Sequence, residues 1–161
     1  MLEEYTLIYE SPLNNGKVYL HPKHSKSEII ENSGIGKRLA DHNKIVLLPI
    51  YINAKGVKNP DAIIDGLLTD FKSPRHAHNF EGAIQGCISK ANKQKVAVVV
   101  INIDNPEATK NAIQEGIRKA FFIDESRNRH IKEVWLLYKD DSLVELTMEE
   151  IRSMRYIDKL Q

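Results

Sequence analysis

With 161 residues, of which 42% are hydrophobic and 28% charged, the chain has the composition of a soluble globular protein that can bury a substantial core. Its net charge of +1 argues neither for nor against a polyanionic partner, so nucleic-acid binding would have to come from a local basic patch and not from the field of the whole chain. The single cysteine, Cys87, excludes an internal disulfide and a cysteine-rich zinc site, and no apolar run reaches the ~18 residues of a membrane span.

The pattern of apolar residues and turn signals predicts alternating strands and helices along the chain. The predicted strands span 5–10, 17–20, 44–53, 96–103, 133–139 and 142–146, with a hairpin over 60–72. The predicted helices span 27–41, 79–94, 106–120 and 148–154. Ser25 or Ser27 is expected to cap the first helix, and Pro106 to lie in the first turn of the third. The predicted fold class is therefore α/β, or α+β, with a mixed central sheet and flanking helices.

The chain contains no evident linker, repeat or low-complexity tract, so we expect a single domain over residues 1–161. Within this domain, residues 1–24 would form an N-terminal hairpin extension. Residues 25–103 would form a core of helix, three strands, helix and strand. Residues 104–161 would add C-terminal helices and a strand pair.

The most informative segment is the predicted hairpin, which sets two acids and a lysine close together. Asp65-Gly66 stands between two apolar runs, as expected of a type I′ turn, which needs positive φ at both central residues. Opposed carboxylates on paired strands repel each other, and a divalent cation would offset that repulsion. Without a metal, Asp70 and Lys72 would form an ordinary exposed ion pair. The expected pairs are Ile64 with Leu67, Ile63 with Leu68, Ala62 with Thr69, and Asp61 with Asp70, with Lys72 on the face of Asp70.

Two further polar residues fall on predicted inward stripes of the flanking helices. Glu28 precedes the buried stripe of the first helix, and Gln94 continues that of the second. Glu28, Asp61 and Asp70 would form an oxygen-rich cluster suited to Mg²⁺ or Mn²⁺, with Zn²⁺ as an alternative. Lys72 beside the ion would orient the attacking water or stabilise the transition state. Glu28 is equally consistent with a first-turn residue that favours the helix dipole.

Basic residues follow the lysine strand and continue on the next helix. They are predicted to contact the substrate backbone, although scattered cations also serve simply to solvate a surface. These residues are Arg75, His76, His78, Lys90 and Lys93. The histidines of the chain are expected on the surface, and Cys87 is expected to be a buried structural thiol.

Pro60-Asp61 followed by Asp70-Phe71-Lys72 resembles the motif of the PD-(D/E)xK nuclease superfamily. The predicted element order over residues 25–103 is similar to the restriction-endonuclease-like αβββαβ core of that superfamily. The resemblance implies a metal-dependent nuclease with Asp61, Asp70 and Lys72 in its active site. It further implies that Glu28 supplies the acid of the first core helix and that Gln94 is a helix-borne active-site glutamine.

Other stretches of the chain resemble the C-terminal toxin domains of CdiA-type contact-dependent growth inhibition proteins and related phage and mobile-element domains. This resemblance implies a toxin nuclease, with transfer RNA favoured over DNA, and a cognate immunity protein as partner. We expect action in the cytoplasm of the target or host bacterial cell, either after delivery within a larger secreted protein or as a stand-alone protein, and no membrane segment. The stretches are His21-Pro22, Glu28, Asn32, Leu39-Ala40, Val46-Leu47-Leu48-Pro49, Lys58-Asn59-Pro60-Asp61, Asp65-Gly66, Asp70-Phe71-Lys72 and Ala91-Asn92-Lys93-Gln94.

Two other functions remain compatible with these residues. One is a metal-independent ribonuclease of the barnase-like toxin fold, in which Lys72, Arg75 and a histidine would carry out acid–base chemistry on the 2′-hydroxyl. The other is a non-enzymatic binding module or immunity-type partner, in which the acids form a docking surface for a basic protein.

Overall fold

The computed structural model describes residues 2–123 and 128–161, and the chain folds into two compact units, Met1–Phe71 and Lys72–Gln161. Strands and helices alternate along the chain, so the predicted mixed α+β class is confirmed. The predicted order of helix, three strands, helix and strand over residues 25–103 is also present. The expectation of a single domain with three parts stays a prediction.

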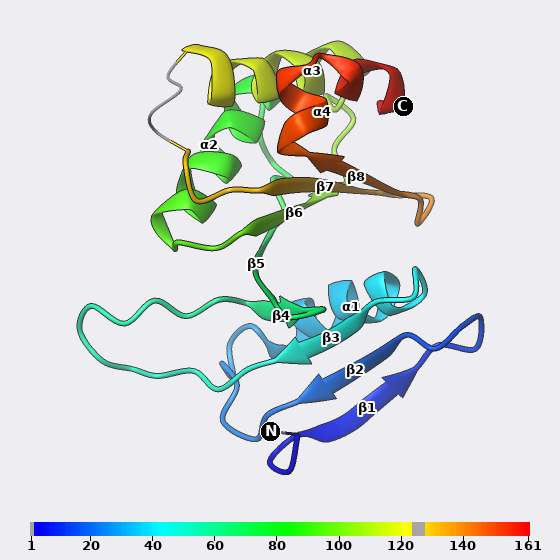
Figure 1. Cartoon of the computed structure of the whole chain (residues 1–161), viewed down its shortest axis with the longest axis vertical. Coiled ribbons are helices and arrows are strands. Elements are labelled where there is room, and N and C mark those ends of the chain that lie inside the picture. Colours follow the sequence, from blue (N-terminus) through cyan, green and yellow to red (C-terminus); the bar gives the residue numbers. More distant parts are fainter. Residues whose placement is uncertain (1, 124–127) are drawn as a thin grey trace. The chain divides into compact units, whose positions relative to one another are not determined.

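In the first unit, one helix packs on one face of the strands (Figure 1). The elements are β1 (Thr6–Glu10), β2 (Lys17–Leu20), α1 (Ile29–Ala40), β3 (Ile45–Leu48), β4 (Ala62–Ile64) and β5 (Leu67–Lys72), whose last residue is counted with the second unit. They pair in the order β1-β2-β3-β4-β5, with β2 and β3 parallel and the other neighbours antiparallel. A Cβ on Gly36 of α1 would lie 3.3 Å from the Val46 side chain and 3.4 Å from that of Val18. The fully buried Val18 and Val46 therefore face α1 and form the core of this unit.

The hairpin of β4 and β5 has the predicted register. Ala62 pairs with Thr69, and the ladder continues through Ile63–Leu68 and Ile64–Leu67 to the turn. Asp65 and Gly66 have φ values of 49° and 85°, which is the pair of left-handed conformations that a type I′ turn requires. The turn chemistry of two residues thus sets which side chains face each other along the hairpin.

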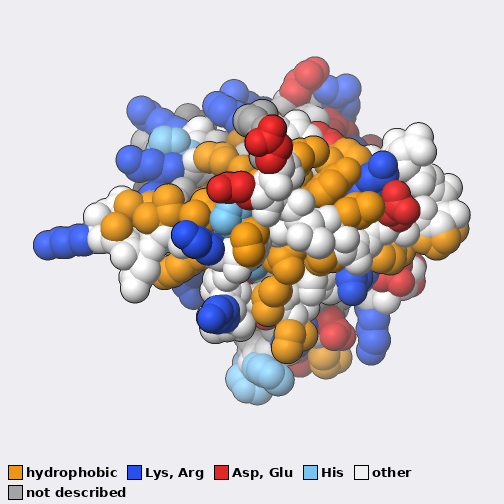
Figure 2. All heavy atoms as spheres, turned by 90° about the horizontal axis from the view of Figure 1, so that it is seen from below, with side chains coloured by type: hydrophobic (Ala, Val, Ile, Leu, Met, Phe, Trp, Pro, Cys, Tyr) orange, Lys and Arg blue, Asp and Glu red, His pale blue; other side chains and the backbone are white. Residues whose placement is uncertain are grey.

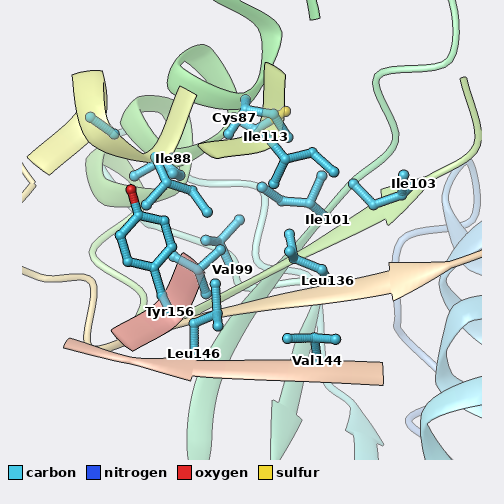
Figure 3. Packing of buried hydrophobic residues seen from close by; sticks show 14 of the residues in the cluster. Cys87, Ile88, Val99, Ile101, Ile103, Ile113, Leu136, Val144, Leu146 and Tyr156 are labelled. Atoms are coloured by element: carbon cyan, nitrogen blue, oxygen red, sulfur yellow. The ribbon is translucent and has the colours of Figure 1, made fainter. Parts of the chain in front are cut away.

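The second unit has its own hydrophobic core between helices and a short sheet. Its elements are α2 (Phe80–Lys93), β6 (Val98–Ile103), α3 (Lys110–Arg118), the π-helical segment η1 (Lys119–Ile123), β7 (Glu133–Tyr138), β8 (Leu143–Thr147), α4 (Met148–Arg152) and the 3₁₀ helix η2 (Arg155–Lys159). β6 runs parallel to β7, and β7 runs antiparallel to β8. Every residue of β6 is buried, as its unbroken apolar run predicted. Figure 3 shows Ile88 of α2 and Ile113 of α3 directed toward the strands that carry Ile101 and Leu136.

Two predicted helix starts are wrong. α1 begins at Ile29 after Glu28, whose side chain makes no capping hydrogen bond, so neither Ser25 nor Ser27 is the cap. α3 begins only at Lys110, because the hydroxyl of Thr109 accepts a hydrogen bond from the amide of Ala112 and caps the helix there. Pro106 therefore lies in the preceding turn. Thr109 caps α3 with its side chain, whereas α1 starts without a side-chain cap.

A structured loop joins β3 to β4 and carries exposed apolar side chains, at Ile50, Tyr51, Ile52 and Val57. The side-chain amide of Asn59 closes this loop, because it accepts from the amide of Ile52 at 2.8 Å and donates to the carbonyl of Ile52 at 3.0 Å. Figure 2 shows hydrophobic side chains reaching the surface across one face of the molecule, with lysine and arginine side chains around them. Among the described residues, none of the helices has the length and hydrophobicity needed to cross a bilayer.

Candidate functional site

Asp61 and Asp70 lie at the same end of the β4–β5 hairpin, the end opposite the turn. A continued ladder would pair the amide of Phe71 with the carbonyl of Pro60. Instead, the Phe71 amide donates to the carboxylate of Asp61 at 2.8 Å. The Asp61 carboxylate is therefore held beside the residue that directly follows Asp70.

Asp70 is a buried acid within β5, with only 2% of its surface exposed. A carboxylate at this depth requires hydrogen bonds, a cation or both to offset its lost hydration. Because side chains alternate along a strand, Lys72 lies on the same side of β5 as Asp70. By the ladder register, Thr69 shares a face with Ala62 and Ile64, the face on which α1 packs, so Asp70 and Lys72 belong to the opposite face.

Glu28 does not lie on the buried stripe of α1, contrary to the prediction. The stripe begins at Asn32 and continues through Ile35 and Leu39, whereas Glu28 is exposed at the residue before the helix starts. Within the described ranges 2–123 and 128–161, the structure gathers no group of three or more His, Cys, Asp or Glu side chains that could hold a metal ion. Within this described part of the chain the three-carboxylate cluster is therefore not assembled, and Glu28 is exposed to solvent.

The position expected for an inward acid on α1 is taken by a buried amide–imidazole pair. His24 Nδ1 donates to the carbonyl of Pro49 at 2.6 Å, and the Asn32 amide donates to His24 Nε2 at 3.2 Å. This arrangement ties α1 to the chain leaving β3. The expectation of surface histidines is wrong for His24 and His21, which are 7% and 5% exposed. In the sequence, the burial of these two histidines is indicated only by their position in the short His21-Pro22-Lys23-His24 segment before the helix.

In the second unit, the positive charges of Lys72 and Lys90 both lower the pKa of the Cys87 thiol. Burial raises the pKa of Cys87 to about 11, and the positive charges of Lys72 and Lys90 partly oppose that rise. The thiol is therefore protonated at neutral pH and unreactive, as predicted for a structural cysteine. The two lysines, one predicted to be catalytic and the other to bind substrate, both lie within electrostatic reach of the same side chain.

The remaining predicted residues of the second unit lie mainly at its surface. Gln94 is half-buried at the C-cap of α2, one residue beyond the last helical residue, so it follows the stripe without being part of the helix. Lys90 and Lys93 in the last turn of α2 are also placed favourably for the helix dipole. The exposed members of the predicted set are Arg75, His76, His78, Lys90 and Lys93.

Asn105 holds the loop that carries the basic residues, a role the sequence did not reveal. Its side-chain amide donates to the carbonyls of Pro74, Arg75 and Ala77 at 3.0–3.1 Å. Its Oδ1 accepts from the amide of Glu107 at 2.8 Å. An Asn-Pro pair after a buried strand indicates a turn, but no local pattern points to a loop about 30 residues earlier.

Comparison with known proteins gives a family and a similar fold. A family model described as the contact-dependent growth inhibition CdiA C-terminal domain matches residues 58–143, more than half of the chain. One chain of the solved CdiA-CT/CdiI toxin and immunity complex from Burkholderia pseudomallei is similar with a TM-score of 0.56 and 18% identity, over 78% of this chain and 91% of that chain. A comparison with curated protein sequences found no significant match.

The fold and the hairpin define a mixed α+β protein with two acids and a lysine at one hairpin end, followed by a basic loop and helix. The chain belongs to the CdiA C-terminal domain family of contact-dependent growth inhibition. The matched range begins just before Asp61 and includes Asp70, Lys72 and the basic residues, but leaves out Glu28.

Proposed function

We propose that this chain is a metal-dependent nuclease that hydrolyses phosphodiester bonds as the toxin domain of a contact-dependent inhibition protein. The observation that carries the proposal is the hairpin itself. The register predicted from Asp65-Gly66 is present, Asp61 and Asp70 lie at the end of the hairpin away from the turn, and Lys72 is two residues beyond Asp70. The resemblance of these residues to the PD-(D/E)xK motif supports the same chemistry.

The donor set fits Mg²⁺ or Mn²⁺ better than Zn²⁺. Mg²⁺ is commonly held by one or two carboxylates together with water and substrate phosphates, so the pair Asp61 and Asp70 suffices without a third protein ligand. Zn²⁺ prefers thiolate and imidazole ligands, whereas Cys87 is protonated and the described residues gather no histidine group that could hold a metal. When bound, the ion would lower the pKa of a water molecule and stabilise negative charge on the phosphate.

The protein side chains would contribute positioning and charge. Asp61 is pre-positioned by the backbone of Phe71, which reduces the entropy lost on binding. Lys72 would stabilise the extra negative charge of the phosphate transition state as a fixed cation on the same side of β5. The roles of Glu28 and Gln94 in the same reaction stay predictions. Glu28 would approach the substrate from a position that is not on the buried face of α1.

The substrate and partner follow from the resemblance and the family. We favour transfer RNA over DNA, with Arg75, His76, His78, Lys90 and Lys93 contacting the phosphate backbone. A cognate immunity protein is the proposed partner, since the similar solved structure is described as a toxin and immunity complex. Action would take place in the cytoplasm of the target bacterial cell after delivery within a larger secreted protein.

The test is cleavage of total RNA and of plasmid DNA by the purified chain, with Mg²⁺, with Mn²⁺ and with EDTA. Asp70→Asn and Lys72→Met should each lower the cleavage rate by about a hundredfold or more, as is typical when one group that stabilises transition-state charge is removed. Asp104→Asn and Lys139→Met serve as matched controls, because these two exposed residues form a loose 3.8 Å pair away from the hairpin in the sequence.

Cleavage that is abolished by EDTA and by Asp70→Asn, but retained in the controls, supports the proposal. Cleavage of RNA that is indifferent to EDTA contradicts it and favours the metal-independent ribonuclease. Absence of cleavage with either substrate and either metal contradicts it in favour of a binding module. Cleavage of the plasmid with RNA left intact would support the nuclease but overturn the preference for transfer RNA.

A further inference from the structure

The second unit contains a hollow of about 740 Å³ that lies outside the hairpin motif. This volume falls within the range of roughly 300–1,000 Å³ typical of small-ligand sites. The hollow is formed by η1, the chain entering β7 and the short helix α4. The side chains that define its chemistry are Phe121, Phe122, Met148, Arg129, Lys132 and Arg152.

The cations around this hollow differ from several others in the second unit that form ion pairs. Arg118, Lys119 and Lys159 each form an ion pair with a glutamate at 2.6–3.0 Å. The exposed side chains of Arg129, Lys132 and Arg152 have no carboxylate partner among the residues that the structure describes. Three cations at one site, with no carboxylate partner in the described part of the chain, favour an anionic ligand.

The wall of the hollow is held in place by hydrogen bonds from its own backbone and side chains. Asn128 Nδ2 donates to the carbonyl of Ala120 at 2.6 Å, which ties the wall to η1. The amide of Lys132 donates to the carbonyl of Ala97 at 2.7 Å, and the carbonyl of Lys132 accepts from the amide of Met148 at 3.0 Å. The hollow is therefore preformed, and little ordering would be needed when a ligand binds.

A further hydrogen bond joins this wall to the end of α2. The amide of His130 donates to Oδ1 of Asn92 at 2.9 Å. Asn92 lies in the last turn of α2 between Lys90 and Lys93, two of the residues predicted to contact the substrate. The hollow and these lysines thus belong to adjoining parts of the same unit.

We infer that this hollow binds a single unpaired nucleotide of the nucleic-acid substrate, with the base against Phe121 and Phe122 and its phosphates near Arg129, Lys132 and Arg152. Stacking on aromatic rings combined with phosphate contacts from cations is the usual way in which proteins hold unpaired nucleotides. A preformed hollow of this size admits one nucleotide but excludes a base-paired helix. The inference rests on the proposed nuclease function, because it assigns a second contact for the same substrate.

The test measures binding separately from cleavage, in an Asp70→Asn background that leaves the substrate uncut. Fluorescence anisotropy would follow a labelled single-stranded RNA, the same sequence as single-stranded DNA, and the RNA duplex, at several salt concentrations. Changing Arg129, Lys132 and Arg152 together to alanine should weaken binding of the single strand and reduce its salt dependence. The slope of log K against log salt should fall by about 2, at about 0.7 per lost phosphate contact.

The matched control removes the same charge at exposed lysines elsewhere, with Lys26, Lys110 and Lys139 changed together to alanine. A second variant pair, Phe121→Leu and Phe122→Leu, keeps apolar volume but removes the rings. One lost stacking contact should raise the Kd by roughly five- to a hundredfold with no change in the salt slope. Thermal unfolding would identify leucine variants that lose their fold, and the charge variants, which alter only exposed residues, do not depend on that result.

The inference is supported if the alanine and leucine variants of the hollow (the pocket variants) bind the single strand more weakly than the unmodified chain, while the control variant binds it equally well. Equal affinity in the pocket and control variants, or equal loss for single strand and duplex, overturns it. If the unmodified chain cleaves nucleic acid while the pocket variants bind normally, the inference fails and the nuclease function stands. If the unmodified chain cleaves nothing, the nuclease function fails, and the anisotropy measurement still decides whether the hollow binds a nucleotide. Comparison of the affinities for the RNA and DNA single strands shows whether the 2′-hydroxyl of the sugar contributes to binding.

Discussion

Replacing Asn105 should release the loop that carries the predicted substrate-binding residues. The side-chain amide of Asn105 contacts three loop carbonyls and also accepts one backbone amide. Because the amide nitrogen has only two hydrogens, the three carbonyls share two full hydrogen bonds. With the accepted bond, about three hydrogen bonds are lost in Asn105→Ala.

The expected magnitude follows from the exposure of these bonds. A typical intramolecular hydrogen bond contributes about 1 kcal/mol, and water can replace part of that contribution where the bond is exposed. Two of the four contacts of Asn105 are exposed, so we expect Asn105→Ala to cost about 2 kcal/mol. Asn105→Asp keeps the acceptor for Glu107 but places a carboxylate against three carbonyl oxygens, so it should cost at least as much.

Hydrogen exchange measured by mass spectrometry would localise the effect. A loss of 2 kcal/mol in local opening free energy corresponds to exchange about thirtyfold faster in peptides covering residues 73–79. Urea unfolding would report any change in global stability, and Asn111→Ala, which removes an exposed amide from α3, is the matched control. Exchange within threefold of the unmodified chain in both Asn105 variants would refute the idea that this side chain holds the loop.

The other predictions concern packing and titration. Gly116→Ala should destabilise the chain by about 2 kcal/mol or more in urea unfolding, because a Cβ there would lie 2.5 Å from Cβ of Ile84 and 2.7 Å from the carbonyl of Glu81. Gly86→Ala, which meets nothing within 4 Å, should instead stabilise by about 0.5–1 kcal/mol, and equal effects of the two changes would contradict the packing. Burial raises the pKa of Cys87 from 9.0 to about 11, so the folded state keeps a proton that the unfolded state loses as the pH rises through this range. The free energy of unfolding should therefore fall by about 2 kcal/mol more between pH 9 and 11 than in Cys87→Ala, and identical pH profiles would exclude a buried neutral thiol.

Local chemistry explains the parts of the fold that were predicted correctly. The register from Ile64–Leu67 to Ala62–Thr69 depends on the Asp65-Gly66 turn, and both residues adopt the positive φ values that the turn requires. The stripe of Phe80, Ile84, Cys87 and Ala91 is buried as its spacing indicated. A turn type and a helical period are properties of neighbouring residues, so they can be recognised in a single sequence.

Glu28 shows where this reasoning fails. Its spacing continues the stripe of α1, but the helix begins one residue later, at Ile29, and the inward position is occupied by the pair of Asn32 and His24. That pair is satisfied by the carbonyl of Pro49, which lies 25 residues along the chain from His24. The choice of helix start thus depends on a partner that periodicity does not identify.

From its residue order alone, this chain determined the order of its elements, the hairpin register from Ala62–Thr69 to the turn, and the placement of Asp61 and Asp70 at one hairpin end, because each depends on contacts between near neighbours. The folded structure decided which residues support those acids and the basic loop after β5. The amide of Phe71 holds Asp61, and Asn105 holds the loop after β5. The segment that carries Arg129 and Lys132 is joined by hydrogen bonds to the Asn92 side chain of α2, to the carbonyl of Ala97 just before β6, and to the amide of Met148 in α4. Such contacts arise only when distant segments pack together, since a side chain's hydrogen-bond partner depends on proximity in space and not on position in the sequence.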